Sequence, residues 1–184
     1  LKTGRVKSLQ FLDQHDNSWN VKEMTTYLEE VETEPHHINL YFDGGFNRET
    51  YSAGLGVVIY YEQNKKRYRL RKNALVEGLT SNNEAEYAAL HLGLKELELL
   101  GAHHIPVTFV GDSMVVINQL TDEWPVYEEE LTRWLDRIEA KLELLGMTPE
   151  FELVSRNQNK EADQLATQAL NGVDILSKKQ LDSE

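Results

Sequence analysis

The chain has 184 residues, 40% of them hydrophobic, no cysteine and a formal net charge of −12 at pH 7, and this length allows one domain with a small appendage. The absence of cysteine excludes disulfide-linked partners and thiolate metal sites. No apolar run reaches the roughly 18–20 residues that span a membrane, so without a signal segment we expect a cytoplasmic protein. The acidic charge argues against binding to nucleic acid, unless carboxylates gather around divalent cations that then supply a positive field.

Residues 1–37 predict a partial α/β appendage and a linker. Residues 8–12 are typical of a short strand, and apolar residues at helical spacing between 21 and 31 predict a helix with Asn20 as its N-cap. Residues 32–37 are polar and are expected to link this segment to the rest of the chain. The segment is too small to bury a core of its own, and its sequence does not identify a partner for it.

Residues 38–172 predict a main α/β domain, and the polar tail at 173–184 is expected to be loose. Alternating apolar residues predict strands, and apolar residues three or four positions apart predict helices. This pattern indicates an antiparallel hairpin followed by parallel crossovers. The expected order is strands at 38–43, 54–61 and 66–72, a helix at 82–100, a strand at 105–110, helices at 113–120 and 128–145, a strand at 151–154 and a helix at 159–170.

Two aspartates follow predicted strands, at the place where open α/β sheets bind their ligands. Asp43 ends the first strand of the main domain, and Gly44 and Gly45 after it allow a backbone or a ligand to approach closely. Asp112 follows the strand at 105–110 and precedes a helix. Each aspartate also has a simpler interpretation, because Asp forms turns and caps helices.

Two glutamates open the long helix and point to different faces of it. Glu86 lies on the apolar stripe, where a carboxylate is costly unless another group pairs with it. Glu84 lies on the side of Lys95 and Glu98, which we expect to face solvent, and it can close a capping box with Ser81. The sequence therefore predicts a functional role for Glu86 and a structural role for Glu84.

A fourth carboxylate, Asp163, borders the apolar stripe of the last helix near its start, where the helix dipole alone would favour it. Together, the two strand-end aspartates and these two acids on inner helix edges indicate one cluster of negative charge, which is unstable without cations. Oxygen ligands of this kind suit Mg²⁺ or Mn²⁺. Two such ions roughly 3.5–4 Å apart can activate a water and stabilise the leaving oxygen of a phosphodiester.

Five segments form a set of motifs, at residues 41–45 (YFDGG), 53–58 (AGLGVV), 81–87 (SNNEAEY), 111–113 (GDS) and 159–166 (NKEADQLA). In order and spacing this set resembles the type-1 ribonuclease H family, and it is most similar to the reverse-transcriptase-like branch. The resemblance extends from about residue 38 to residue 172. Any one of the segments is a weak signal, whereas all five in order are highly specific.

The resemblance implies an α/β, ribonuclease H-like fold with a five-stranded mixed sheet in the order 3-2-1-4-5, flanked by helices. It implies an endoribonuclease that hydrolyses the RNA strand of RNA/DNA hybrids with two Mg²⁺ or Mn²⁺ ions, leaving 5′-phosphate and 3′-hydroxyl ends. The resemblance further implies that the hybrid is contacted in its minor groove, where a 2′-hydroxyl distinguishes RNA from DNA. The implied catalytic and metal-binding residues are Asp43, Glu86, Asp112 and Asp163, and the substrate-binding residues are Gly44, Gly45, Asn82, Asn83 and Ser113. Arg156 is expected to hold a phosphate and so to do part of the work of a family histidine that this chain lacks.

The chain departs from the family pattern in three places. Residues 46–50 replace a common Gly-Asn-Pro-Gly loop, residues 153–158 lack a common histidine, and residues 124–130 lack a basic protrusion. These departures leave open a weakly active or inactive module that binds hybrid or RNA, a nuclease that acts on another RNA substrate, and an acidic interaction protein. Basic residues at 65–72 are interpreted either as protection of an edge strand or as a strip that contacts phosphates.

Overall fold

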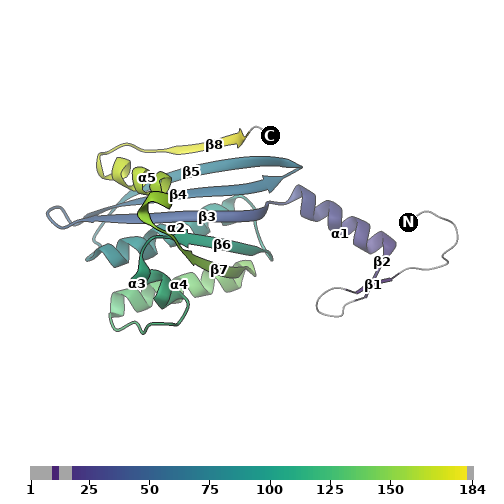
Figure 1. Ribbon diagram of the computed structural model, residues 1–184, viewed down its shortest axis with the longest axis horizontal. Coiled ribbons are helices and arrows are strands. Elements are labelled where there is room, and N and C mark those ends of the chain that lie inside the picture. Colours follow the sequence, from purple (N-terminus) through teal and green to yellow (C-terminus); the bar gives the residue numbers. More distant parts are fainter. Residues whose placement is uncertain (1–9, 13–17, 182–184) are drawn as a thin grey trace.

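The structure, a computed structural model, describes residues 10–12 and 18–181 (Figure 1). Every element expected between residues 38 and 170 is present, although several strands are longer than expected. The first two residues of the strand expected at 8–12 lie outside the described part. The elements are β1 (Gln10–Leu12), β2 (Ser18–Asn20), α1 (Val21–Thr33), β3 (His36–Asn47), β4 (Ser52–Gln63), β5 (Lys66–Glu77), α2 (Asn82–Leu99), β6 (Pro106–Gly111), α3 (Met114–Leu120), α4 (Glu129–Leu145), β7 (Thr148–Leu153), a short 3-10 helix (Arg156–Gln158), α5 (Lys160–Leu170) and β8 (Leu176–Leu181).

The main sheet has six strands in the order β7-β6-β3-β4-β5-β8. Strands β3, β4 and β5 form an antiparallel meander, while β6 and β7 continue the sheet in parallel on the other side of β3. The predicted mixed sheet and its order are therefore confirmed, but the predicted number of five strands is wrong. The additional strand, β8, comes from the tail that was expected to be loose, and it pairs antiparallel with β5.

Strand β8 forms because β5 would otherwise leave a row of unpaired backbone groups along the sheet edge. Asn73 of β5 fixes the approach to β8, since its side chain donates to the Val173 carbonyl at 2.8 Å and accepts from the Ile175 amide at 2.7 Å. In the folded chain β5 is not an edge strand, so its basic side chains have no open edge to protect there. Arg71 donates to the Ser177 hydroxyl of β8 at 3.2 Å.

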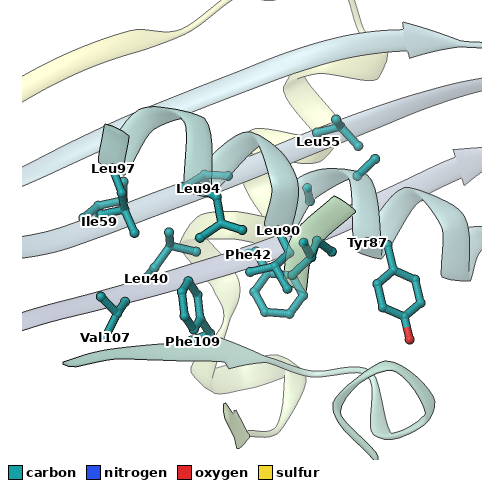
Figure 2. Packing of buried hydrophobic residues seen from close by; sticks show 14 of the residues in the cluster. Leu40, Phe42, Leu55, Ile59, Tyr87, Leu90, Leu94, Leu97, Val107 and Phe109 are labelled. Atoms are coloured by element: carbon teal, nitrogen blue, oxygen red, sulfur yellow. The ribbon is translucent and has the colours of Figure 1, made fainter. Parts of the chain in front are cut away.

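Helices cover both faces of the sheet. On one face, α2 packs on β3 and β4 around the buried side chains of Leu40, Phe42 and Leu90 (Figure 2), and α4 packs on α2. On the other face, α5 packs on β4 so closely that a Cβ on Gly54 or Gly56 would come within 2.1 Å of a carbonyl oxygen of α5. Glycine is therefore required at these two positions, because any side chain would push α5 off the sheet.

The appendage consists of the β1–β2 hairpin and α1, which extends away from the sheet (Figure 1). The predicted cap of α1 is confirmed: the Asn20 side chain accepts from the Glu23 amide at 2.8 Å, and the Glu23 carboxylate accepts from the Asn20 amide at 3.1 Å. The expected linker at 32–37 is shorter than predicted, since only Glu34 and Pro35 separate α1 from β3. Among the described helices, none is long and apolar enough to cross a membrane.

Candidate active site

Three of the predicted carboxylates meet where β3, β6 and α2 come together. Asp43 lies within β3, which continues beyond it to Asn47, so the prediction that this strand ends at Asp43 is wrong. Asp112 directly follows β6, the parallel neighbour of β3, and Glu86 lies in the second turn of α2. One carboxylate oxygen from each of the three lies within 4.8 Å of the others.

Gly44 allows Glu86 to reach this cluster. A Cβ at position 44 would lie 2.2 Å from the Ala85 carbonyl oxygen, so only glycine lets the first turns of α2 contact β3 directly. Through this contact, Glu86, which is 2% exposed, lies beside Asp43 rather than in solvent.

Asp163, near the start of α5, completes the group, and its charge helps to raise the pKa of Asp43. Apart from Asn83, all the residues predicted for the site line one cavity of about 270 Å³, and these are Asp43, Gly44, Gly45, Asn82, Glu86, Asp112, Ser113, Arg156 and Asp163. The cavity therefore brings together side chains from β3, α2, α5 and the segments that follow β6 and β7.

The Asp112 side chain does not cap a helix. The hydroxyl of Ser113 caps α3 instead, by accepting from the Val116 amide at 3.3 Å. The simpler interpretation of Asp112 as a helix cap is therefore wrong, and its carboxylate remains available to the cavity.

When cations are absent, burial and mutual repulsion favour the protonated form of the Asp43 and Glu86 carboxyl groups. Burial, reinforced by the charges of Asp112 and Asp163, raises the pKa of Asp43 to about 7, although a hydrogen bond with Glu86 opposes the shift. Burial and the neighbouring Asp43 also raise the pKa of Glu86 well above its ordinary value. Divalent cations would reverse both shifts, because they favour the ionised form.

The donor set fits hard divalent cations. Its ligand atoms are carboxylate oxygens, which Mg²⁺ and Mn²⁺ prefer. Among the described residues, the Glu86 Oε2 atom is one of the few buried side-chain oxygens without a hydrogen-bond partner. A buried oxygen of this kind is costly unless a proton or a cation satisfies it.

Sequence reasoning missed the structural part that Asn159 plays in the site. This residue, 1% exposed at the start of α5, donates to the Phe42 carbonyl at 3.0 Å and to Asp112 Oδ2 at 3.2 Å. It therefore joins β3, β6 and α5 directly behind the carboxylates. The available signal was its place as the first residue of the NKEADQLA segment, four positions before Asp163.

The predicted environment of Glu84 is wrong. Its side chain is buried rather than exposed, because α4 covers this side of α2. The Glu84 carboxylate accepts from the Thr80 amide at 2.8 Å, the Thr80 hydroxyl at 3.1 Å and Trp134 Nε1 at 2.8 Å. Ser81 does cap the helix through the Glu84 amide, at 3.1 Å, but the Glu84 side chain reaches Thr80 instead of closing the predicted box. Its role is structural, as expected, in a different setting.

Known proteins share this fold and sequence pattern. The family model described as reverse transcriptase-like matches residues 41–169. The uncharacterized protein YpeP of Bacillus subtilis is 46% identical over 177 residues, which cover 96% of this chain and 78% of the relative. The chain spans only 34% of the bifunctional protein Rv2228c of Mycobacterium tuberculosis, at 30% identity.

Solved ribonuclease H1 structures superpose on most of the chain. The enzyme of the halophilic archaeon Halobacterium salinarum gives a TM-score of 0.61 at 27% identity, over 74% of this chain and 98% of its own. LC11-RNase H1 in complex with an RNA/DNA hybrid gives a TM-score of 0.62 at 26% identity, over 73% and 97%.

The fold and the carboxylate cluster define a protein of the type-1 ribonuclease H class. Within that class, the chain belongs to the reverse transcriptase-like family. The family, the fold and the enzyme class predicted from the sequence are therefore confirmed.

Proposed function

We propose that the chain is a cytoplasmic endoribonuclease that hydrolyses the RNA strand of RNA/DNA hybrids and leaves 5′-phosphate and 3′-hydroxyl ends. One observation carries this proposal: carboxylate oxygens of Asp43, Glu86 and Asp112 lie within 4.8 Å of one another in a cavity that Asp163 also lines. LC11-RNase H1, whose structure contains an RNA/DNA hybrid, shares this fold and supports the choice of substrate.

The four carboxylates would hold two Mg²⁺ or Mn²⁺ ions. Such ions supply an activated water and stabilise the charge that develops on the leaving oxygen of a phosphodiester. Asp43 would be the most central ligand, since each of the other three acids influences its pKa. Asn159 keeps the Asp112 carboxylate turned toward the cavity.

Residues around the carboxylates would bind the hybrid. Arg156 is exposed at the rim of the cavity, where its guanidinium can hold a phosphate beside the acids. Asn82 lines the same cavity, and Asn83 follows it in the first turn of α2. We assign both asparagines to the minor groove of the hybrid, where a 2′-hydroxyl distinguishes RNA from DNA. The backbone of Gly44, Gly45 and Ser113 provides the remaining contacts.

The proposal is tested by incubating the protein with a labelled RNA/DNA hybrid, the matching duplex RNA and the single-stranded RNA, each with Mg²⁺ or Mn²⁺. We expect internal cleavage of the hybrid alone, with 5′-phosphate ends, and complete loss of cleavage in excess chelator. Tight hybrid binding without cleavage in either metal would support a binding module instead. Preferred cleavage of single-stranded RNA would support a nuclease with another substrate.

A further inference from the structure

A second group of metal-binding side chains lies at the start of β3, where α1 joins the sheet (Figure 1). It consists of His36 and His37 of β3 and Glu62 near the end of β4, and one ligand atom from each lies within 4.8 Å of the others. His37 and Asp43 are six positions apart on the same strand. At a rise of roughly 3.3 Å per residue, this group lies about 20 Å from the carboxylate cluster.

An irregularity in β3 turns both histidines toward Glu62. Consecutive side chains of a regular strand point to opposite faces of the sheet, so they cannot share one partner. Here the register of β3 on β4 shifts between His36 and Asn39, and His37 has a φ of 49°, which is uncommon outside glycine. The two rings consequently lie 5.0 Å apart, with His37 Nδ1 at 2.9 Å and His36 Nε2 at 3.6 Å from Glu62 Oε2. Strained backbone and bulges of this kind gather at functional sites.

The surroundings prepare His36 to bind a metal ion. Its Nδ1–H donates to the Glu34 carbonyl oxygen at 2.9 Å, which leaves the lone pair of Nε2 facing Glu62. Histidines that bind metals commonly make such a hydrogen bond through their other ring nitrogen, because it fixes the tautomer and the orientation of the ring. The Glu34 carboxylate is itself held by His103 Nε2 at 3.2 Å.

We propose that His36, His37 and Glu62 bind one Zn²⁺ ion at the junction between the appendage and the sheet. Imidazole nitrogens are typical zinc ligands, whereas a site made only of carboxylates suits magnesium. Donors bound about 2.0–2.1 Å from a tetrahedral zinc ion are roughly 3.3 Å apart. The distances from Glu62 Oε2 to His37 Nδ1 and to His36 Nε2, 2.9 Å and 3.6 Å, lie on either side of that value.

The site has room for a fourth zinc ligand and for the proton that His37 keeps on its other ring nitrogen. His37 and Glu62 line a cavity of about 200 Å³, which leaves room for a water molecule as the fourth ligand. With Nδ1 bound to zinc, His37 carries its proton on Nε2, and its side chain is 75% exposed to solvent. The bound ion would join the first residues of β3 to the end of β4 and so restrain the base of α1.

The test is a calorimetric titration of the full chain with Zn²⁺ in a large excess of Mg²⁺. The protein carries Asp43→Asn and Asp112→Asn, so that the carboxylate cluster loses two of its ligands. We expect one equivalent of zinc to bind and to raise the melting temperature. Loss of a residue that only hydrogen-bonds to a metal ligand lowers metal affinity roughly 10–100-fold. His37→Asn or Glu62→Gln, added to this protein, removes a ligand itself, so each should weaken zinc binding by more than that.

The variants are chosen to separate loss of ligands from loss of fold. Asparagine tolerates the positive φ of position 37, and glutamine keeps the shape of Glu62. His91→Gln is the matched control, because His91 lies on α2 beside Trp134 and should bind zinc like the background protein. Melting curves without zinc identify a variant that fails to fold. If one of the two variants fails to fold, zinc binding by the other variant tests the proposal. Zinc binding that is absent from the background protein, or unchanged in both variants, would overturn the proposal.

Discussion

Asn159 donates a hydrogen bond from its side-chain amide to Asp112 Oδ2 at 3.2 Å, although the two residues are 47 positions apart in the chain. The same amide donates to the Phe42 carbonyl, one residue before Asp43. A single buried side chain therefore joins the Asp112 carboxylate to the backbone next to Asp43, another of the residues that we assign to the metals.

We expect Asn159→Ala to lower both stability and activity, because it leaves a buried carbonyl unpaired and frees Asp112 to turn. The free energy of unfolding should fall by about 1–3 kcal/mol. The cleavage rate at low Mg²⁺ should fall roughly 10–100-fold and recover in part at high Mg²⁺. Single-turnover cleavage against Mg²⁺ concentration measures this, with Asn157→Ala, an exposed neighbour, as the control. An unchanged Mg²⁺ dependence would show that Asn159 has no positioning role.

Asp112→Asn should reduce cleavage of the hybrid by orders of magnitude without unfolding the protein. The amide keeps the shape of the carboxylate but removes one ligand charge, and α3 keeps its cap because Ser113 supplies it. Cleavage assays and melting curves measure the two effects. Asp136→Asn, on the exposed side of α4, is a matched control that should cut at the normal rate. Near-normal cleavage by Asp112→Asn would remove this residue from the site.

Glu86→Gln and Glu84→Gln should separate catalysis from stability in two buried acids of the same helix. We expect Glu86→Gln to lose activity by orders of magnitude and to melt higher than the unsubstituted protein in chelator, since it removes repulsion with Asp43.

Glu84→Gln should keep its activity but lose about 1–3 kcal/mol of stability, because an amide cannot accept all the hydrogen bonds from Thr80 and Trp134. Single-turnover cleavage and chemical denaturation with and without Mg²⁺ measure both properties. The reverse pattern, in which Glu84→Gln is inactive and Glu86→Gln keeps normal activity, would show that the site is assigned to the wrong face of α2.

The stability of the metal-free protein should fall as the pH rises from about 4 through 7. Burial raises the pKa of Asp43 from 3.8 to about 7 in the folded chain, so the folded state holds a proton that the unfolded state has already released. The stabilisation that comes from the raised pKa of Asp43 is complete below pH 4 and is lost as the pH passes 7. Denaturation in chelator at several pH values measures it. Asp43→Asn should flatten this part of the profile, and an identical profile in both proteins would contradict the assignment.

Removal of residues 173–184 should lower the melting temperature and promote self-association. Without β8, strand β5 becomes an exposed edge, and the Asn73 side chain loses its partners at Val173 and Ile175. Melting curves and sedimentation velocity measure the two effects. Replacing Lys179 with Ala in the full chain is the control, since it keeps the backbone pairing of β8. A truncated chain that melts normally and stays monomeric would show that β8 adds no stability.

The predictable parts of this molecule are those that repeat a simple pattern. Alternation of apolar residues around Leu40 and Phe42 predicted β3, and helical spacing predicted α2 and the burial of Glu86. The predicted cluster also follows from topology, because Asp43 lies on β3 and Asp112 directly follows β6, the parallel neighbour of β3.

The parts that sequence reasoning missed depend on contacts between distant segments. The polar residues of β8 carry no alternating pattern, and they form a strand only because β5 offers an open edge. Glu84 looked solvent-exposed because nothing local to α2 reveals that Trp134 covers it. The orientation of His37 depends on an irregularity in strand pairing, which no sequence period encodes.

The position of β8 also has a consequence for synthesis on the ribosome. Its pairing with β5 joins segments about a hundred positions apart, since Asn73 already contacts Val173 across 100 residues. During translation, β5 leaves the ribosome long before its neighbour exists, so its edge stays open while the rest of the domain forms. Open strand edges in nascent chains are sites of mispairing and targets for chaperones. The basic residues that crowd β5 would then repel other chains during that interval, before β8 covers the strand.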